Sequence, residues 1–138
     1  MKKILLVISL LLLQIVRGQD FLSQKIVELD KAYNNKELQA LANDFERIAL
    51  AEKNNSLAQY YTAYTYVRIA DQAKENLIDS YCDKAEEYLK KAISLGFDSS
   101  ETNALYAYLY SAKVKVSPMF RGSKMGKISK EYGQKAIK

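Results

Sequence analysis

The sequence predicts an all-α fold of stacked antiparallel helical hairpins, with about six helices, and three observations support this prediction. Beyond residue 20 the apolar residues recur at helical spacing. The chain contains a single proline, Pro118, and one short sequence pattern returns at a nearly fixed interval. With 138 residues, 49% of them hydrophobic and 27% charged, the chain is long enough for one globular domain with a core of its own.

The first 18 residues have the layout of a signal peptide. Lys2 and Lys3 precede an apolar run over residues 4–13, which is shorter than the roughly 20 residues of a membrane span. Val16 and Gly18 provide the small side chains that a signal peptidase requires, so we predict cleavage after Gly18 and a periplasmic or secreted protein. An uncleaved inner-membrane signal anchor is the alternative. A mature chain that starts with Gln after such a signal resembles exported proteins of the Bacteroidetes.

The first predicted hairpin covers residues 19–55 and holds two apolar stripes, each followed by an asparagine pair. Asn34 and Asn35 end the first stripe, and Asn54 and Asn55 end the second. Asparagine is frequent in turns and at helix ends, so we expect two antiparallel helices here. The stripes consist of Phe21, Leu22, Ile26, Leu29 and Tyr33, and of Leu38, Leu41, Ala42, Phe45, Ile48 and Ala49.

The next two helices are expected over residues 57–74 and 79–95. Ser56 and Gln59 have the spacing of a capping box, in which both side chains bind free backbone N–H groups at a helix start. The second of these helices is expected to stop at Gly96, because glycine readily adopts the left-handed conformation that ends a helix.

The last two helices are expected over residues 98–116 and 124–137. Asp98 is a suitable N-cap for the first of them. Phe97, just before this cap, is expected to fold back onto the preceding helix. Pro118 is expected to interrupt the helical pattern and to leave an irregular stretch before the final helix.

A repeated alanine indicates that the hairpins are copies of one unit. Ala49, Ala92 and Ala136 occupy equivalent places in the second helix of each predicted hairpin, 43 and 44 residues apart. A small residue at such a place lets two helices approach closely. The interval therefore favours a stack of similar hairpins.

Residues 83–95 resemble the second helix of a tetratricopeptide repeat, which has Ala, a bulky residue and Ala at corresponding places. The resemblance implies a right-handed solenoid with repeats at 56–97 and 98–138 and a degenerate first hairpin at 19–55. The family repeat is about 34 residues long, and the hairpins here are about nine or ten residues longer. The repeat pattern also ends without a capping helix, so we expect either that the chain is a fragment of a longer protein or that a partner or a second copy covers this end.

Tyrosine is the most informative residue type, with eleven copies gathered mainly on two predicted helices. Tyrosine combines a large apolar ring with a hydroxyl group and is enriched at interfaces. Tyr60, Tyr64, Tyr106 and Tyr110 are expected to pack between helices. In the tetratricopeptide family the first helix of each repeat lines a concave groove, and the resemblance implies that the following residues point into it: Tyr61, Thr65, Arg68, Ala104, Tyr108 and Ser111.

The charge is distributed unevenly along the chain. Residues 19–110 carry 10 Lys and Arg against 15 Asp and Glu, whereas residues 111–138 carry 8 against 1. The basic end could attract an acidic peptide, anionic lipid or a polyanionic glycan, while nucleic acid is not expected outside the cytoplasm. Phe120, Arg121 and Lys124 are the candidate contact residues in this segment.

The residue types of most catalytic and metal sites are missing. The chain contains no histidine, no CxxC pair, no glycine-rich phosphate loop and no nucleophile motif. Its one cysteine, Cys82, cannot form an internal disulfide and is expected to be buried. We therefore expect no enzyme activity, no catalytic residues, no metal and no cofactor.

Three functions are compatible with the sequence. The leading hypothesis is an exported adaptor that binds a protein or peptide partner in a tyrosine-lined groove. The first alternative is a small-molecule or glycan carrier with an enclosed tyrosine pocket, and the second is a structural unit that assembles with itself. No transmembrane helix is expected in the mature chain.

Overall fold

The computed structural model describes residues 20–138, and every regular element in that range is an α-helix. Residues 20–31 are helical, and five helices follow: α2 (Asn35–Ala51), α3 (Ser56–Gln72), α4 (Glu75–Ser94), α5 (Ser99–Val114) and α6 (Pro118–Ala136). The predictions of an all-α fold and of about six helices are confirmed. The predicted signal peptide lies outside the described residues. Within 20–138 no helix has the length and apolar composition needed to cross a membrane.

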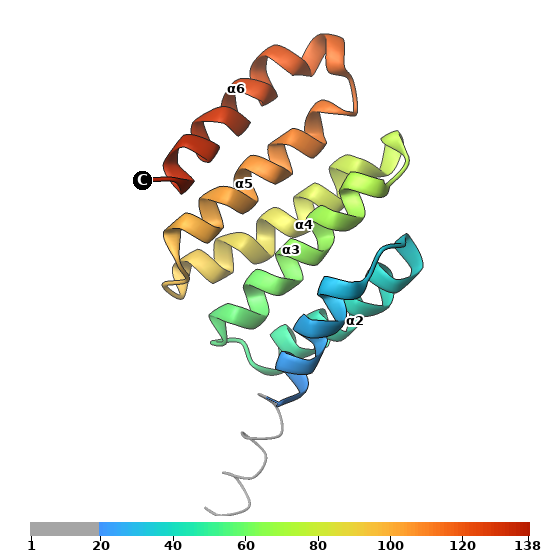
Figure 1. Ribbon diagram of the computed structural model, residues 1–138, viewed down its shortest axis with the longest axis vertical. Coiled ribbons are helices and arrows are strands. Elements are labelled where there is room, and N and C mark those ends of the chain that lie inside the picture. The colour runs from blue at the N-terminus through green and yellow to red at the C-terminus, as the bar shows by residue number, and fades with distance from the viewer. Residues whose placement is uncertain (1–19) are drawn as a thin grey trace, which may run out of the picture.

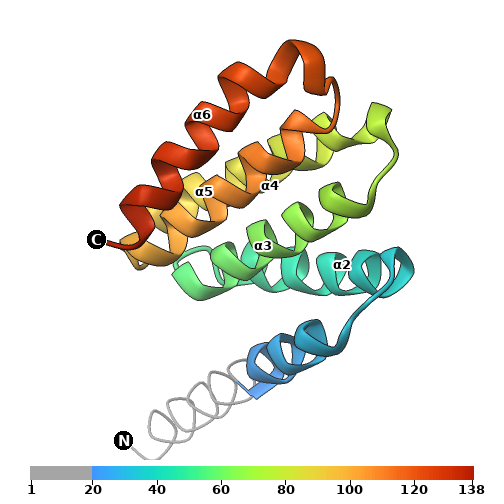
Figure 2. The ribbon, with the colours of Figure 1, turned by 45° about the horizontal axis from the view of Figure 1, so that its top comes forward.

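Consecutive helices form three antiparallel hairpins that stack on one another (Figure 1). The first helix pairs with α2, α3 pairs with α4, and α5 pairs with α6, and Figure 2 shows the same order from a tilted view. Because α3 also contacts α5, the first helices of neighbouring hairpins lie side by side. They form one side of the stack, on which the candidate site lies.

The helix α3 is at the centre of the core. Ten of its 17 residues are buried, and they lie on more than one face of the helix. The apolar stripes predicted for the first hairpin also bury their key members, including Leu29, Leu38 and Phe45 at 0% exposure. Each such side chain contributes about 1.5 to 3 kcal/mol through the removal of apolar surface from water. Ala49 and Ala92 are buried as well, which fits their predicted role at close helix contacts.

Two predicted helix ends are present as expected. Asp98 caps α5, because its carboxylate accepts a hydrogen bond from the backbone N–H of Glu101 at 3.0 Å. Asn34 caps α2 in the same way through the N–H of Glu37, also at 3.0 Å. These bonds satisfy N–H groups that have no partner inside the helix.

The predicted capping box at the start of α3 is wrong by one residue. Asn55 is the N-cap, and its side chain accepts from the N–H of Ala58 at 3.1 Å. Ser56 is already the first helical residue. Gln59 is buried and donates to the carbonyl of Ala49 at 3.0 Å, so a contact with the preceding helix has replaced the local cap.

Pro118 starts the last helix and does not interrupt the fold as predicted. It occupies the first turn of α6, where the missing N–H of proline costs nothing and its fixed φ angle suits the helix. Residues 118–123, expected to be irregular, therefore form the first turns of α6. The segment that precedes it is a short turn between α5 and α6.

The end of α4 follows the predicted glycine signal. Gly96 has φ +79°, and the N–H of Phe97 bonds to the carbonyl of Ala92 at 3.1 Å, which closes the last turn. The ring of Phe97 lies against the ring of Tyr60 on α3, with 4.4 Å between the centroids. The turn therefore delivers an aromatic ring to α3, the other helix of the same hairpin.

Candidate functional site

A pocket of about 510 Å³ lies between α3, α5 and the end of the first helix. We call it the tyrosine pocket. Its volume is in the range of roughly 300 to 1,000 Å³ that is typical of small-molecule sites. The residues that line it are Asp30, Tyr60, Tyr61, Tyr64, Phe97, Glu101, Ala104, Leu105 and Tyr108.

The aromatic wall of the tyrosine pocket is held by mutual packing of the rings. Tyr60 and Tyr64 are one helical turn apart on α3, and their rings lie nearly parallel, with 6.4 Å between centroids and 3° between planes. Phe97 stacks on Tyr60, and Tyr61 stacks on Phe45 of α2 at 6.0 Å. Such contacts fix the ring orientations, so the wall is formed before any ligand arrives.

Three phenol groups that line this pocket, those of Tyr60, Tyr61 and Tyr108, resist ionisation. Burial raises the pKa of Tyr60 well above its usual value, and the Glu101 carboxylate, which accepts a hydrogen bond from the Tyr60 hydroxyl at 3.1 Å, raises it further. Burial also raises the pKa of Tyr61. Burial and the nearby Asp71 carboxylate raise the pKa of Tyr108 to about 12. The pocket therefore presents neutral rings and hydroxyl groups at neutral pH.

The charged groups of the tyrosine pocket are both negative. Asp30 and Glu101 line it, and no lysine or arginine is among its lining residues. Within residues 20–138 neither carboxylate takes part in an ion pair. The pocket thus combines aromatic faces with negative charge that no basic side chain offsets directly.

The structure places several of the tyrosines singled out by sequence in this one pocket. Tyr61 and Tyr108 line it from α3 and α5, together with Ala104. Tyr60 and Tyr64 were expected only to pack between helices, and they do pack against other rings, but they line the pocket as well. Tyrosines from two hairpins therefore share a single cavity.

The other residues expected in the groove are not available to a ligand in the same way. Thr65 is fully buried, with its hydroxyl bonded to the carbonyl of Tyr61 at 2.7 Å, so the prediction that it faces a partner is wrong. Arg68 donates to the carbonyls of Leu29 and Ala32, both at 2.6 Å, and holds the end of the first helix against α3. Ser111 is exposed but does not line the pocket.

The candidate residues of the basic segment lie on α6, away from the pocket lining. Phe120 is 85% exposed and Lys124 is exposed. Arg121 forms an ion pair with Asp79 at 2.7 Å, and this hydrogen bond lowers the pKa of that carboxyl group. Arg121 therefore connects α6 to α4, and a contact surface at Phe120 and Lys124 stays a prediction.

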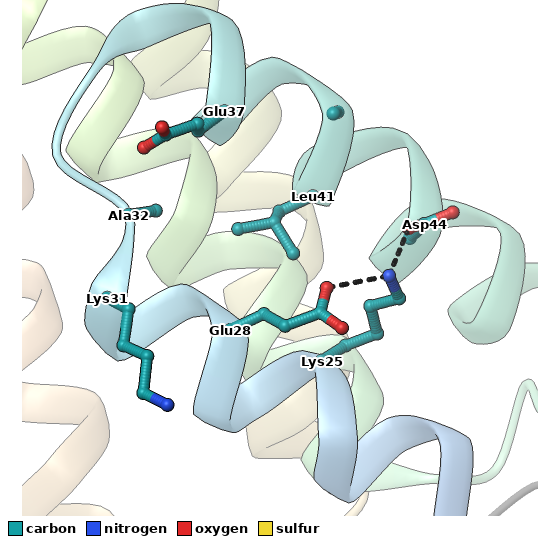
Figure 3. Close-up of a pocket in the computed structure, with 8 residues that line it drawn as sticks. Lys25, Glu28, Lys31, Ala32, Glu37, Leu41 and Asp44 are labelled. Carbon is teal, nitrogen blue, oxygen red and sulfur yellow. Dashed lines mark hydrogen bonds and ion pairs between the residues drawn. The ribbon is translucent and has the colours of Figure 1, made fainter.

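A second cavity, of about 370 Å³, lies between the first helix and α2 (Figure 3). We call it the ion-paired hollow. The Lys25 ammonium group lies between the carboxylates of Glu28 and Asp44, at 2.7 and 3.1 Å (Figure 3). The charges of these three side chains therefore satisfy one another. The hollow is lined by Lys25, Glu28, Lys31, Ala32, Glu37, Ala40, Leu41 and Asp44.

Sequence reasoning missed four residues of the tyrosine pocket: Asp30, Phe97, Glu101 and Leu105. Two of the four could be found by extending the helical spacing of Tyr108 backwards, because Glu101 and Leu105 are seven and three residues before it on the same helix. Phe97 precedes this helix and reaches the pocket from the turn after α4. Asp30 has no local signal. It reaches the pocket from a different hairpin, and only the tertiary fold brings it there.

The comparisons with known proteins give one structural likeness. No protein-family model matches the chain, and a search of the curated proteins found no match. Among solved structures the chain is similar to the HusA haemophore from Porphyromonas gingivalis, with 34% sequence identity and a TM-score of 0.78. The similarity covers 86% of this chain and 58% of the HusA chain, so this chain corresponds to little more than half of that protein.

Proposed function

We propose that this protein is an exported carrier that binds a planar porphyrin-type ligand, such as haem, in the tyrosine pocket. The observation that carries the proposal is the aromatic pocket itself, with five rings from two hairpins around about 510 Å³. The likeness to a haemophore, a protein that carries haem, supports this ligand class. A flat conjugated ring offers two large faces, which aromatic side chains bind by stacking.

The chemistry of the pocket favours stacking over coordination of iron. The chain has no histidine, the commonest nitrogen ligand of haem iron. Tyrosine is a known haem ligand, but as a phenolate. Because burial raises the pKa of Tyr60, Tyr61 and Tyr108, a phenolate ligand at neutral pH would require loss of a tightly held proton. We therefore assign most of the affinity to ring contacts.

A carrier was the first alternative in the sequence analysis, where the leading hypothesis was an adaptor that binds a protein or peptide. The haemophore likeness supports the carrier better than the adaptor, since it points to a small ligand. The aromatic residues that suggested a peptide groove serve a flat ligand equally well. Binding without catalysis, export by the N-terminal segment and a tetratricopeptide-like repeat all remain parts of this proposal, as the sequence predicts them.

The proposal is tested by titrating ferric haem into the purified protein and following the Soret absorption band. We expect saturable binding at one site. The Tyr61→Leu, Tyr108→Leu double variant keeps two apolar side chains but removes two ring faces. It should weaken binding by about 2 kcal/mol or more, which is roughly 30-fold.

Tyr33→Leu is the matched control, because Tyr33 is 82% exposed and does not line the pocket. Its haem affinity should equal that of the parent protein, and circular dichroism should show the same helicity in all three proteins. A parent protein that shows no saturable haem binding would overturn the proposed function. Equal affinity in the double variant would place the ligand elsewhere.

A further inference from the structure

The negative charge of the tyrosine pocket affects which parts of a ligand can enter it. Asp30 and Glu101 are on its wall and are not paired with a basic side chain within residues 20–138. The partner that Glu101 does have is neutral, because its carboxylate accepts a hydrogen bond from the Tyr60 hydroxyl at 3.1 Å. The pocket therefore carries negative charge at neutral pH.

The basic group beside the pocket does not cancel this charge. The guanidinium of Arg68 is 5.9 Å from the ring centre of Tyr64, so it is close to the wall. Both of its hydrogen-bonding arms, however, are directed to the carbonyls of Leu29 and Ala32. A ligand carboxylate inside the pocket would meet two carboxylates and receive no direct ion pair.

The faces of the aromatic rings also disfavour an anionic group of the ligand. A ring carries negative charge density on its face, so it attracts cations and disfavours anions. The electrostatics of the carboxylates and of the rings therefore both select against an inserted acid group. They select for a neutral or positively charged part of a ligand.

We infer that the tyrosine pocket selects its ligand by charge, accepting a neutral or cationic planar ring and leaving any acid groups of the ligand outside, in solvent. This inference rests on the proposed function, and it adds the orientation of the ligand and the residues that impose it. Asp30 and Glu101 are then specificity-determining residues, in addition to the stacking rings.

The test uses one porphyrin ring in three forms: the free diacid, its dimethyl ester and an amide that carries two amino groups. We expect esterification to leave the affinity unchanged or to strengthen it. The amino form should bind about tenfold more tightly than the diacid at low salt, and added salt should reduce this ratio.

The Asp30→Asn, Glu101→Gln double variant keeps the shapes of both side chains and one acceptor oxygen in each, and it removes their charges. It should bring the ratio of affinities for the amino form and the diacid close to one. The Glu131→Gln variant is the control, because Glu131 is an exposed carboxylate on α6 and does not line the pocket. It should keep the parent ratio.

The outcomes separate this inference from the function on which it rests. If none of the three forms binds, the proposed function fails and the inference fails with it. If all bind but esterification weakens binding tenfold, the function stands and the orientation is wrong, because the acid groups are then recognised. A charge preference that persists in the Asp30→Asn, Glu101→Gln variant would also overturn the inference.

Discussion

The tyrosine pocket and the ion-paired hollow share one helix as a wall but differ in how their polar groups are used. The first helix contributes Asp30 to the pocket and Lys25 to the hollow. In the hollow, Lys25 pairs with the carboxylates of Glu28 and Asp44, and these three charges are satisfied within the protein. In the pocket, the carboxylates face five aromatic rings and meet no basic group among the lining residues.

This difference shows why cavity size alone does not identify a binding site. A ligand entering the hollow would have to break ion pairs that already exist between Lys25, Glu28 and Asp44. A flat ligand entering the pocket covers preformed rings and loses no internal partner. The two cavities therefore differ in whether their lining groups already have partners inside the protein.

The largest expected effect is unfolding at high pH, because unfolding destroys the tyrosine pocket. Burial raises the pKa of Tyr60, Tyr66, Tyr88, Tyr106 and Tyr108 above the usual value near 10. The unfolded chain releases these protons first, so their contribution to stability is complete below pH 10 and is lost as pH rises through the higher folded values.

We therefore expect helicity and tyrosinate absorbance to change together in one cooperative step above pH 10. Circular dichroism and ultraviolet absorbance of the same samples provide the measurement. The hollow side is less sensitive to pH, because its ion pairs are partly exposed to solvent: the hydrogen bond from Lys25 lowers the pKa of Glu28, and this small contribution is lost only as pH falls below 4.5. Complete tyrosine ionisation near pH 10 with unchanged helicity would contradict this account.

The second effect concerns the wall that both cavities share. Arg68→Ala leaves the carbonyls of Leu29 and Ala32 without their charged donor, and we expect a loss of about 2 to 3 kcal/mol in urea unfolding. Arg68→Lys is the informative control. Lysine keeps the charge but cannot donate to both carbonyls through a planar fork, so it should recover only part of the loss. Full recovery with lysine would mean that charge alone matters here.

The smallest effect is expected at the hollow itself. Lys25→Met removes the centre of its ion pairs but keeps the length of the side chain. Because the partners are partly exposed, the unfolding free energy should fall by less than about 1 kcal/mol. Haem affinity should not change. A clear loss of haem binding in this variant would show that the hollow contributes to the site.

Much of the fold is encoded locally and could be predicted. The apolar spacing of Leu29, Leu38 and Phe45 placed the right residues in the core, and Gly96 and Asp98 marked real helix ends. The errors occur where tertiary contacts override local patterns. Gln59 binds a carbonyl of the preceding helix, and Pro118 begins a helix that the sequence suggested it would break.

The candidate site could be predicted only in part. Tyr61 and Tyr108 were identified because tyrosines cluster on equivalent helices. Thr65 was misplaced because the tetratricopeptide resemblance implies which residues of a first helix face the groove, but not that this part of α3 is covered by other helices. The charge of the pocket depends on Asp30, which the fold brings from a separate hairpin, and no short-range pattern contains that information.

The most direct test fills each cavity with the same side chain. Ala104 on α5 lines the tyrosine pocket, Ala40 on α2 lines the ion-paired hollow, and both are exposed alanines on helices. Haem titration of Ala104→Trp and Ala40→Trp should show a loss of roughly 100-fold, about 2.7 kcal/mol, in the first and no change in the second. Unchanged binding in Ala104→Trp, or an equal loss in both variants, would contradict the assignment of the ligand to the tyrosine pocket.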